Sequence, residues 1–100
     1  MKVNVQTPNF SADVKLIDFI NRKLSKLELF YDRIIHADVF LKVRQTSEKE
    51  NKSTEILLSI PGGDIMVKKD ARSFEQATDE CVQSLERQLK KRKEKQRPFA

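Results

Sequence analysis

The sequence has very few of the residues on which secreted, metal-binding and membrane proteins depend. Cys81 is its only cysteine, so no disulfide can form within the chain and a reducing compartment is expected. His36 is its only histidine, and neither residue has further ligands at the spacing of a metal site. The N-terminal residues lack the apolar core of a signal peptide, and no apolar run approaches the roughly 20 residues of a membrane span. We therefore expect a soluble, cytoplasmic protein without a cofactor.

The residue patterns that indicate catalysis are also missing from the sequence. No serine or cysteine has a candidate general base at a recognisable spacing. The glycine pair at 62–63 falls between two expected strands, which is typical of a hairpin turn and not of a phosphate-binding loop. The sequence therefore predicts a protein that is not an enzyme.

Positive charge is abundant, and its excess lies at one end of the chain. The protein has 20 basic and 15 acidic residues, a net charge of +5. The segment 85–100 holds seven of the basic residues and two of the acidic ones, so the rest of the chain has 13 of each sign and is neutral. A concentrated positive charge favours an anionic partner, either nucleic acid or a membrane surface.

Hydrophobic alternation predicts four short strands in a chain whose length suits one domain. The strands are expected at residues 2–7, 37–45, 54–60 and 64–69. The motif PGGD should form the tight turn between the last two, because glycine adopts positive φ without steric cost.

Two amphipathic helices are expected between and after these strands. Ser11 should cap the first, whose apolar stripe continues to Tyr31, and Ser73 should cap the second. The apolar stripe of the second helix stops at Leu89 while basic residues continue, so residues 91–100 should form a basic helix overhang or tail. The order β-α-β-β-β-α predicts an α+β fold with a four-stranded mixed sheet and both helices packed on one face. This architecture resembles the double-stranded RNA-binding module.

Basic residues follow the outer sides of both expected helices. They are Lys15, Arg22, Lys23 and Lys26 in the first helix and Arg87, Lys90, Lys91 and Lys93 in the second. If the helices share one face of the sheet, the two sets run side by side and complement a phosphate backbone. An ordinary solvated surface remains an alternative for the first helix. It fits the second less well, because solvated faces usually mix charges of both signs.

The expected surface has few aromatic residues on which bases could stack. Tyr31, Phe40 and Phe99 are the candidates for exposed rings. Recognition through phosphates is therefore favoured over stacking of single-stranded bases, which indicates a binder of structured RNA. A membrane-bound helix is disfavoured because the apolar faces of both helices are needed for the core.

Four segments match, in order and spacing, the motifs of one known family. They are KLSKLELFYDRI (23–34), DVFLKV (38–43), GGDIMV (62–67) and SLERQLKKRKEK (84–95). Together they resemble the ribosome hibernation-promoting factors, which include ribosome-associated inhibitor A and are also known as sigma-54 modulation proteins. Since the sequence stops at Ala100, it resembles the short form of that family.

The resemblance implies a function as well as the fold. It implies binding to the small ribosomal subunit in the mRNA and tRNA channel, where the protein blocks tRNA sites, inhibits translation and stabilises idle ribosomes during stress or stationary phase. It also implies a protein that is monomeric when free, binds no membrane and acts on no small-molecule substrate. The implied contacts with ribosomal RNA are Lys23, Lys26, Arg87, Lys90 and Lys91, extended by Lys93 and Lys95.

The chain departs from the family pattern at two positions in its last helix. Glu75 stands where an aromatic residue is common, and Ser84 stands where a lysine often precedes the LERQ motif. Two other functions stay open at this point: a free-standing module for structured RNA, and a protein-interaction module that modulates transcription.

Overall fold

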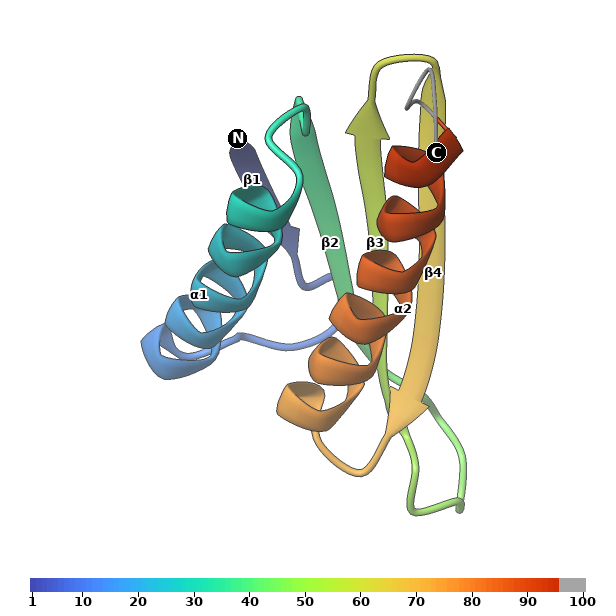
Figure 1. The fold of residues 1–100 in the computed structure, drawn as a ribbon. Coiled ribbons are helices and arrows are strands. Elements are labelled where there is room, and N and C mark those ends of the chain that lie inside the picture. The colour runs from blue at the N-terminus through green and yellow to red at the C-terminus, as the bar shows by residue number, and fades with distance from the viewer. Residues whose placement is uncertain (96–100) are drawn as a thin grey trace.

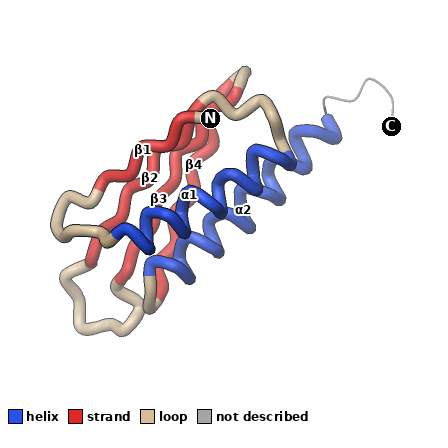
Figure 2. Tube along the Cα trace, turned by 90° about the vertical axis from the view of Figure 1, so that its left-hand side faces the viewer, coloured by secondary structure: helices blue, strands red, loops and turns tan. Residues whose placement is uncertain are grey.

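Two helices cover one face of a four-stranded sheet in the computed structural model, which describes residues 1–95 (Figures 1 and 2). The elements are β1 (Lys2–Gln6), α1 (Val14–Phe30), β2 (His36–Val43), β3 (Lys52–Ile60), β4 (Gly63–Ala71) and α2 (Phe74–Lys95). The strands lie in the order β1-β2-β3-β4, with β1 parallel to β2 and the other pairs antiparallel. This confirms the α+β fold and the element order expected from the sequence. The part of the expected basic tail at 96–100 lies outside the described residues.

Strands β2 and β3 form the middle of the sheet, and their alternate residues build the core. Val39 and Leu41 of β2 are fully buried, as is Ile56, the partner of Val39 on β3. Both β3 and β4 are longer than the hydrophobic alternation predicts, because their pairing continues to Lys52 and Ala71. Polar side chains can extend a ladder without leaving a hydrophobic pattern in the sequence.

The turn between β3 and β4 requires its glycines. Ile60 pairs with Gly63, which leaves Pro61 and Gly62 as a two-residue connection. Gly62 has φ 87° and Gly63 has φ 145°, both in the region that side chains disfavour. The expected hairpin turn is thereby confirmed.

Helix α1 begins later than expected, and Ser11 is not its cap. Asp13 occupies the N-cap, where its carboxylate accepts a hydrogen bond from the Leu16 amide at 2.8 Å. The preceding segment contacts the start of α2, since the ring of Phe10 stacks on Phe74 with centroids 4.7 Å apart. A carboxylate at the N-cap accepts a hydrogen bond from an otherwise unpaired amide, and its negative charge is stabilised by the positive end of the helix dipole.

Both helices bury one stripe against the sheet and lie next to each other. In α1 the fully buried residues are Ile20, Leu24 and Leu27. In α2 the predicted stripe is buried throughout, from Phe74 through Ala77, Cys81 and Leu85 to Leu89. Helix α2 continues from Leu89 to Lys95, and its last turns reach past the end of α1 (Figure 2). The basic residues of α1 and α2 therefore lie on neighbouring helices, and those at the end of α2 extend past α1.

Candidate nucleic-acid interface

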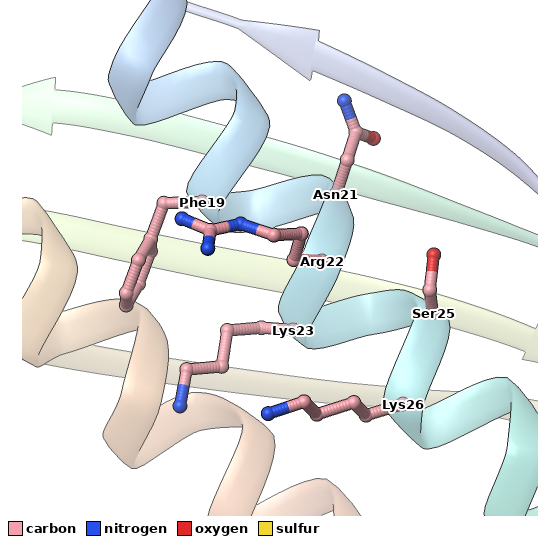
Figure 3. A pocket seen from close by; sticks show the side chains of 6 residues that line it. All are labelled: Phe19, Asn21, Arg22, Lys23, Ser25 and Lys26. Atoms are coloured by element: carbon pink, nitrogen blue, oxygen red, sulfur yellow. The ribbon is translucent and has the colours of Figure 1, made fainter.

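Two basic residues of α1, Lys23 and Lys26, lie on the side of the helix that borders α2. Arg22 and Lys26 are exposed, whereas Lys23 is half-buried. The Lys23 ammonium lies 2.8 Å from the carboxylate of Asp79 on α2, so this side chain crosses between the helices. Figure 3 shows Lys23 and Lys26 extending in the direction of α2, while Asn21 and Ser25 point away from it. The spacing alone predicts that Lys23 is a free residue of the outer face. This prediction is wrong, because its ammonium is bound to Asp79.

The basic residues of α2 lie in its second half. Arg87, Lys90, Lys91 and Lys93 are all exposed, and Lys95 is the last residue of the helix. Lys93 reaches back to α1: its ammonium is 3.4 Å from the carbonyl oxygen of Phe30 and 5.3 Å from the centroid of that ring. The two basic sets therefore meet along one seam between α1 and α2. The contacts that the resemblance implies for these residues stay a prediction.

Arg92 interrupts the basic set of α2 because it points to the sheet. Its guanidinium lies 3.5 Å from the carbonyl oxygen of Pro61, in the turn between β3 and β4. The residue is half-buried, unlike Lys91 and Lys93 on either side of it. Arg92 thus anchors the end of α2 to the hairpin.

The aromatic residues are arranged differently from the expectation. Tyr31 is buried, with 4% of its surface exposed, because α1 ends at Phe30 and the extended backbone of the C-cap directs its ring into the core. Phe40 is half-buried on the sheet face opposite the helices, and Phe99 lies outside the described residues. Sequence reasoning missed Phe19 and Phe30, each of which is half-buried beside a lysine of the seam. The sequence did contain a signal for them: positions 19, 23, 26 and 30 are spaced by three and four residues, so the two phenylalanines share one stripe of the helix with Lys23 and Lys26.

The open face of the sheet has no comparable excess of positive charge among the described residues. Lys68 of β4 is paired in register with Glu55 of β3, and Arg44 binds Asp70 with a 2.9 Å contact. Charges of both signs alternate there, as on an ordinary solvated surface. The positive potential therefore belongs to the helical face, and mainly to its end at the second half of α2.

Cys81 and His36 are placed where structural residues are expected. Cys81 is fully buried, its thiol donates to the carbonyl oxygen of Thr54 at 3.3 Å, and burial raises its pKa to about 12. His36 begins β2, with Nε2 2.9 Å from the hydroxyl oxygen of Ser59.

Within residues 1–95 no three acidic, histidine or cysteine side chains gather in a metal-binding arrangement. None of the helices in the same range is long and apolar enough to cross a bilayer.

The fold and the seam define a small α+β protein with one strongly basic helical end. The family described as "Sigma 54 modulation protein / S30EA ribosomal protein" matches residues 3–97. This protein belongs to that family, which confirms the resemblance drawn from the four sequence segments.

Relatives and solved structures agree with this assignment. A ribosome hibernation promoting factor of Pseudomonas putida is 34% identical over 96 residues, covering 96% of this chain and 90% of that protein. The N-terminal domain of Thermus thermophilus Protein Y has a TM-score of 0.78 at 26% identity, over 91% of this chain and 98% of that one. A ribosomal subunit interface protein from Coxiella burnetii shares the fold, with a TM-score of 0.82 at 19% identity over 93% and 98% of the two chains.

Proposed function

We propose that this protein is a ribosome hibernation factor, which binds the small ribosomal subunit, occupies the mRNA and tRNA channel and keeps idle ribosomes inactive. The single observation that carries the proposal is the family match over residues 3–97, in a chain whose excess charge lies on one helical end. The name of the Pseudomonas putida relative supports the hibernation role, and the description of the Coxiella burnetii structure agrees with a position on the ribosome.

The basic seam suits ribosomal RNA as a ligand. Exposed Arg87, Lys90 and Lys91 can each reach a phosphate, and binding then releases the counterions condensed on the RNA. Arginine can engage a phosphate through two parallel hydrogen bonds, whereas lysine acts as a point charge. Such contacts position a protein on folded RNA without reading its sequence.

The proposed inhibition is steric and needs no chemical step. A protein seated in the channel excludes tRNA simply by occupying its site. Because the binding energy comes largely from phosphate contacts, occupancy should fall steeply with salt, by a slope of about 0.7 to 0.9 per contact on logarithmic axes. Reversible release of this kind is what storage of intact ribosomes requires.

Co-sedimentation in sucrose gradients tests the proposal. Purified protein is mixed with whole ribosomes, small subunits and large subunits, at low and at raised salt, and a free RNA duplex is titrated in parallel. We expect about one copy per small subunit and per ribosome, displaced by raised salt and by tRNA. Protein that stays at the top of the gradient yet binds the free duplex would overturn the ribosomal role while leaving an RNA-binding module.

A further inference from the structure

Two phenylalanine rings lie in the seam among the basic residues, and contacts with phosphates alone give them no role. Phe19 and Phe30 are half-buried, at two ends of the stripe that also carries Lys23 and Lys26. The ammonium of Lys23 is 5.5 Å from the Phe19 centroid, and that of Lys93 is 5.3 Å from the Phe30 centroid. Each ring therefore lies next to a cation on the helical face.

Packing does not fully account for the position of these rings. Phe30 touches the margin of the core, whereas Phe19 lies outside the core cluster formed by the described residues. A partly exposed phenylalanine forgoes much of the free energy that burial would provide. A cation above an exposed ring recovers only about 0.5–1 kcal/mol. A ligand can use the π-face of either ring once the lysine side chain that lies over it moves aside.

Hollows in the surface adjoin both rings. A hollow of about 530 Å³ is lined by Phe19 with the three basic residues Arg22, Lys23 and Lys26, and by the polar Asn21 and Ser25 (Figure 3). Phe30 borders two smaller hollows of about 200 and 290 Å³. These are lined by Arg87, Lys90 and Lys93, and also by the carboxylates of Glu86 and Glu94. Positive charge outnumbers negative charge at both rings, and more strongly at Phe19.

We propose that Phe19 and Phe30 are stacking platforms for unpaired bases of RNA, whose phosphates are held by the neighbouring lysine and arginine residues. The identity of the RNA rests on the proposed function. An aromatic face flanked by cations is the combination with which proteins hold splayed-out or single-stranded nucleotides. Duplex RNA cannot use it, since its bases are stacked on one another.

The spacing of the rings indicates two separate nucleotides. Eleven residues on one helix separate the two positions by about 16 Å along the axis. Neighbouring bases in a stacked strand are only about 3.4 Å apart, so one stack cannot serve both rings. Because the sites are far apart, losses of affinity from the two substitutions should multiply.

The first experiment measures the affinity of ribosomes for Phe19→Leu, Phe30→Leu and the double variant. Leucine keeps the hydrophobic contact and removes the π-face. Each single variant should bind roughly five- to a hundredfold more weakly, with an unchanged salt slope, because no phosphate contact is lost. The matched control is Phe40→Leu, which alters an equally half-buried ring on the opposite sheet face and should bind normally.

The second experiment detects stacking directly and uses the absence of tryptophan from the chain. Tryptophan is placed at one position at a time, by Phe19→Trp, Phe30→Trp and the control Phe40→Trp. Fluorescence is then followed during titration with single-stranded RNA, an abasic strand of equal length and an RNA duplex. We expect quenching at positions 19 and 30 by the strand that carries bases, little by the other two, and none at position 40.

The outcomes separate this inference from the proposed function. Wild-type protein that fails to co-sediment with ribosomes contradicts the proposed function, whatever the tryptophan signals are. Normal ribosome binding by the folded double leucine variant, or equal quenching by the abasic strand, overturns the stacking platforms and leaves the ribosomal role intact.

Discussion

The two halves of helix α2 share one buried stripe but carry opposite charge. From Phe74 to Glu86 the helix has four acidic residues, Glu75, Asp79, Glu80 and Glu86, and no lysine or arginine. From Arg87 to Lys95 it has six basic residues and one acidic residue. The same core contacts run through both halves, since Ala77, Cys81, Leu85 and Leu89 are all fully buried. The difference therefore concerns the surface and not the fold.

Helix stability explains only part of this polarity. Acidic residues near the start and basic residues near the end of a helix stabilise it through their interaction with the helix dipole, but this effect fades within one turn of each end. Arg87, Lys90 and Lys91 lie before the last turn and outside its reach. Their charge therefore suits the anionic partner that we propose.

Charge reversal in the basic half should have the largest effect. The triple variant Arg87→Glu, Lys90→Glu and Lys91→Glu replaces attraction to phosphate by repulsion, a change of several kcal/mol. Ribosome binding should weaken by at least about a hundredfold, measured by co-sedimentation, with an unchanged circular dichroism spectrum.

A control of equal charge separates location from net charge. Lys2→Glu, Lys42→Glu and Lys49→Glu change three exposed lysines away from the helix seam. This variant should bind within a few-fold of the wild type, since long-range effects are screened beyond about 10 Å. Equal losses in the two triple variants would show that only net charge matters.

Shortening a side chain in the buried stripe of α2 should destabilise the protein although it changes no charge. Leu85 is fully buried at the junction of the two halves. Leu85→Ala should lower the free energy of unfolding by about 2–5 kcal/mol, because it removes buried methyl groups and leaves a cavity. Urea denaturation followed by circular dichroism measures this. A loss below about 1 kcal/mol would contradict the packing described for α2.

Release of Lys23 from the acidic half should slightly strengthen binding. Asp79→Asn removes the carboxylate that holds the Lys23 ammonium at 2.8 Å. A partly exposed ion pair is worth about 0–1 kcal/mol, so ribosome affinity should rise by up to about fivefold and stability should barely change. Glu75→Gln, an equal change in charge at an exposed site, should give a smaller gain. Weaker binding by Asp79→Asn would mean that the ion pair itself belongs to the bound state.

The buried thiol of the acidic half should have the smallest functional effect. Because burial raises the pKa of Cys81 to about 12 from 9.0, the folded protein keeps a proton that the unfolded chain loses above pH 9. The stabilising contribution is present below pH 9 and is lost as the pH rises from 9 to 12. In Cys81→Ala the free energy of unfolding should fall less between pH 9 and 12 than in the wild type, as measured by denaturation across that range. Rapid alkylation of the native thiol at about pH 8 would contradict its burial.

Much of the fold could be predicted because its elements follow simple periods. The stripes from Ile20 to Tyr31 and from Phe74 to Leu89 and the alternation around Val39 and Leu41 each correspond to a buried face. Ile17, which the spacing also assigns to the first stripe, is half-buried and lies outside the core cluster. The predicted start of α1 was wrong because Ser11 and Asp13 are both good caps by residue type, and in the structure it is Asp13 that accepts the hydrogen bond from the Leu16 amide.

The candidate site was harder to predict because side-chain direction depends on the neighbouring helix. The sequence indicates which residues are basic but not that Lys23 is bound to Asp79 or that Arg92 reaches Pro61. The prediction of exposed rings was also wrong for Tyr31, because whether Tyr31 or Phe30 faces solvent depends on where α1 ends. A single residue at a helix terminus thus moves an aromatic ring between the core and the seam.

Electron cryomicroscopy of the protein on the small ribosomal subunit would show which face of the protein contacts ribosomal RNA. We expect density in the mRNA and tRNA channel, with the helical face toward ribosomal RNA and Arg87, Lys90 and Lys91 at hydrogen-bond distance from phosphates. The open face of the sheet should lie away from the RNA. Density at another site, or a complex in which the sheet face meets the RNA and the second half of α2 lies in solvent, would contradict this expectation.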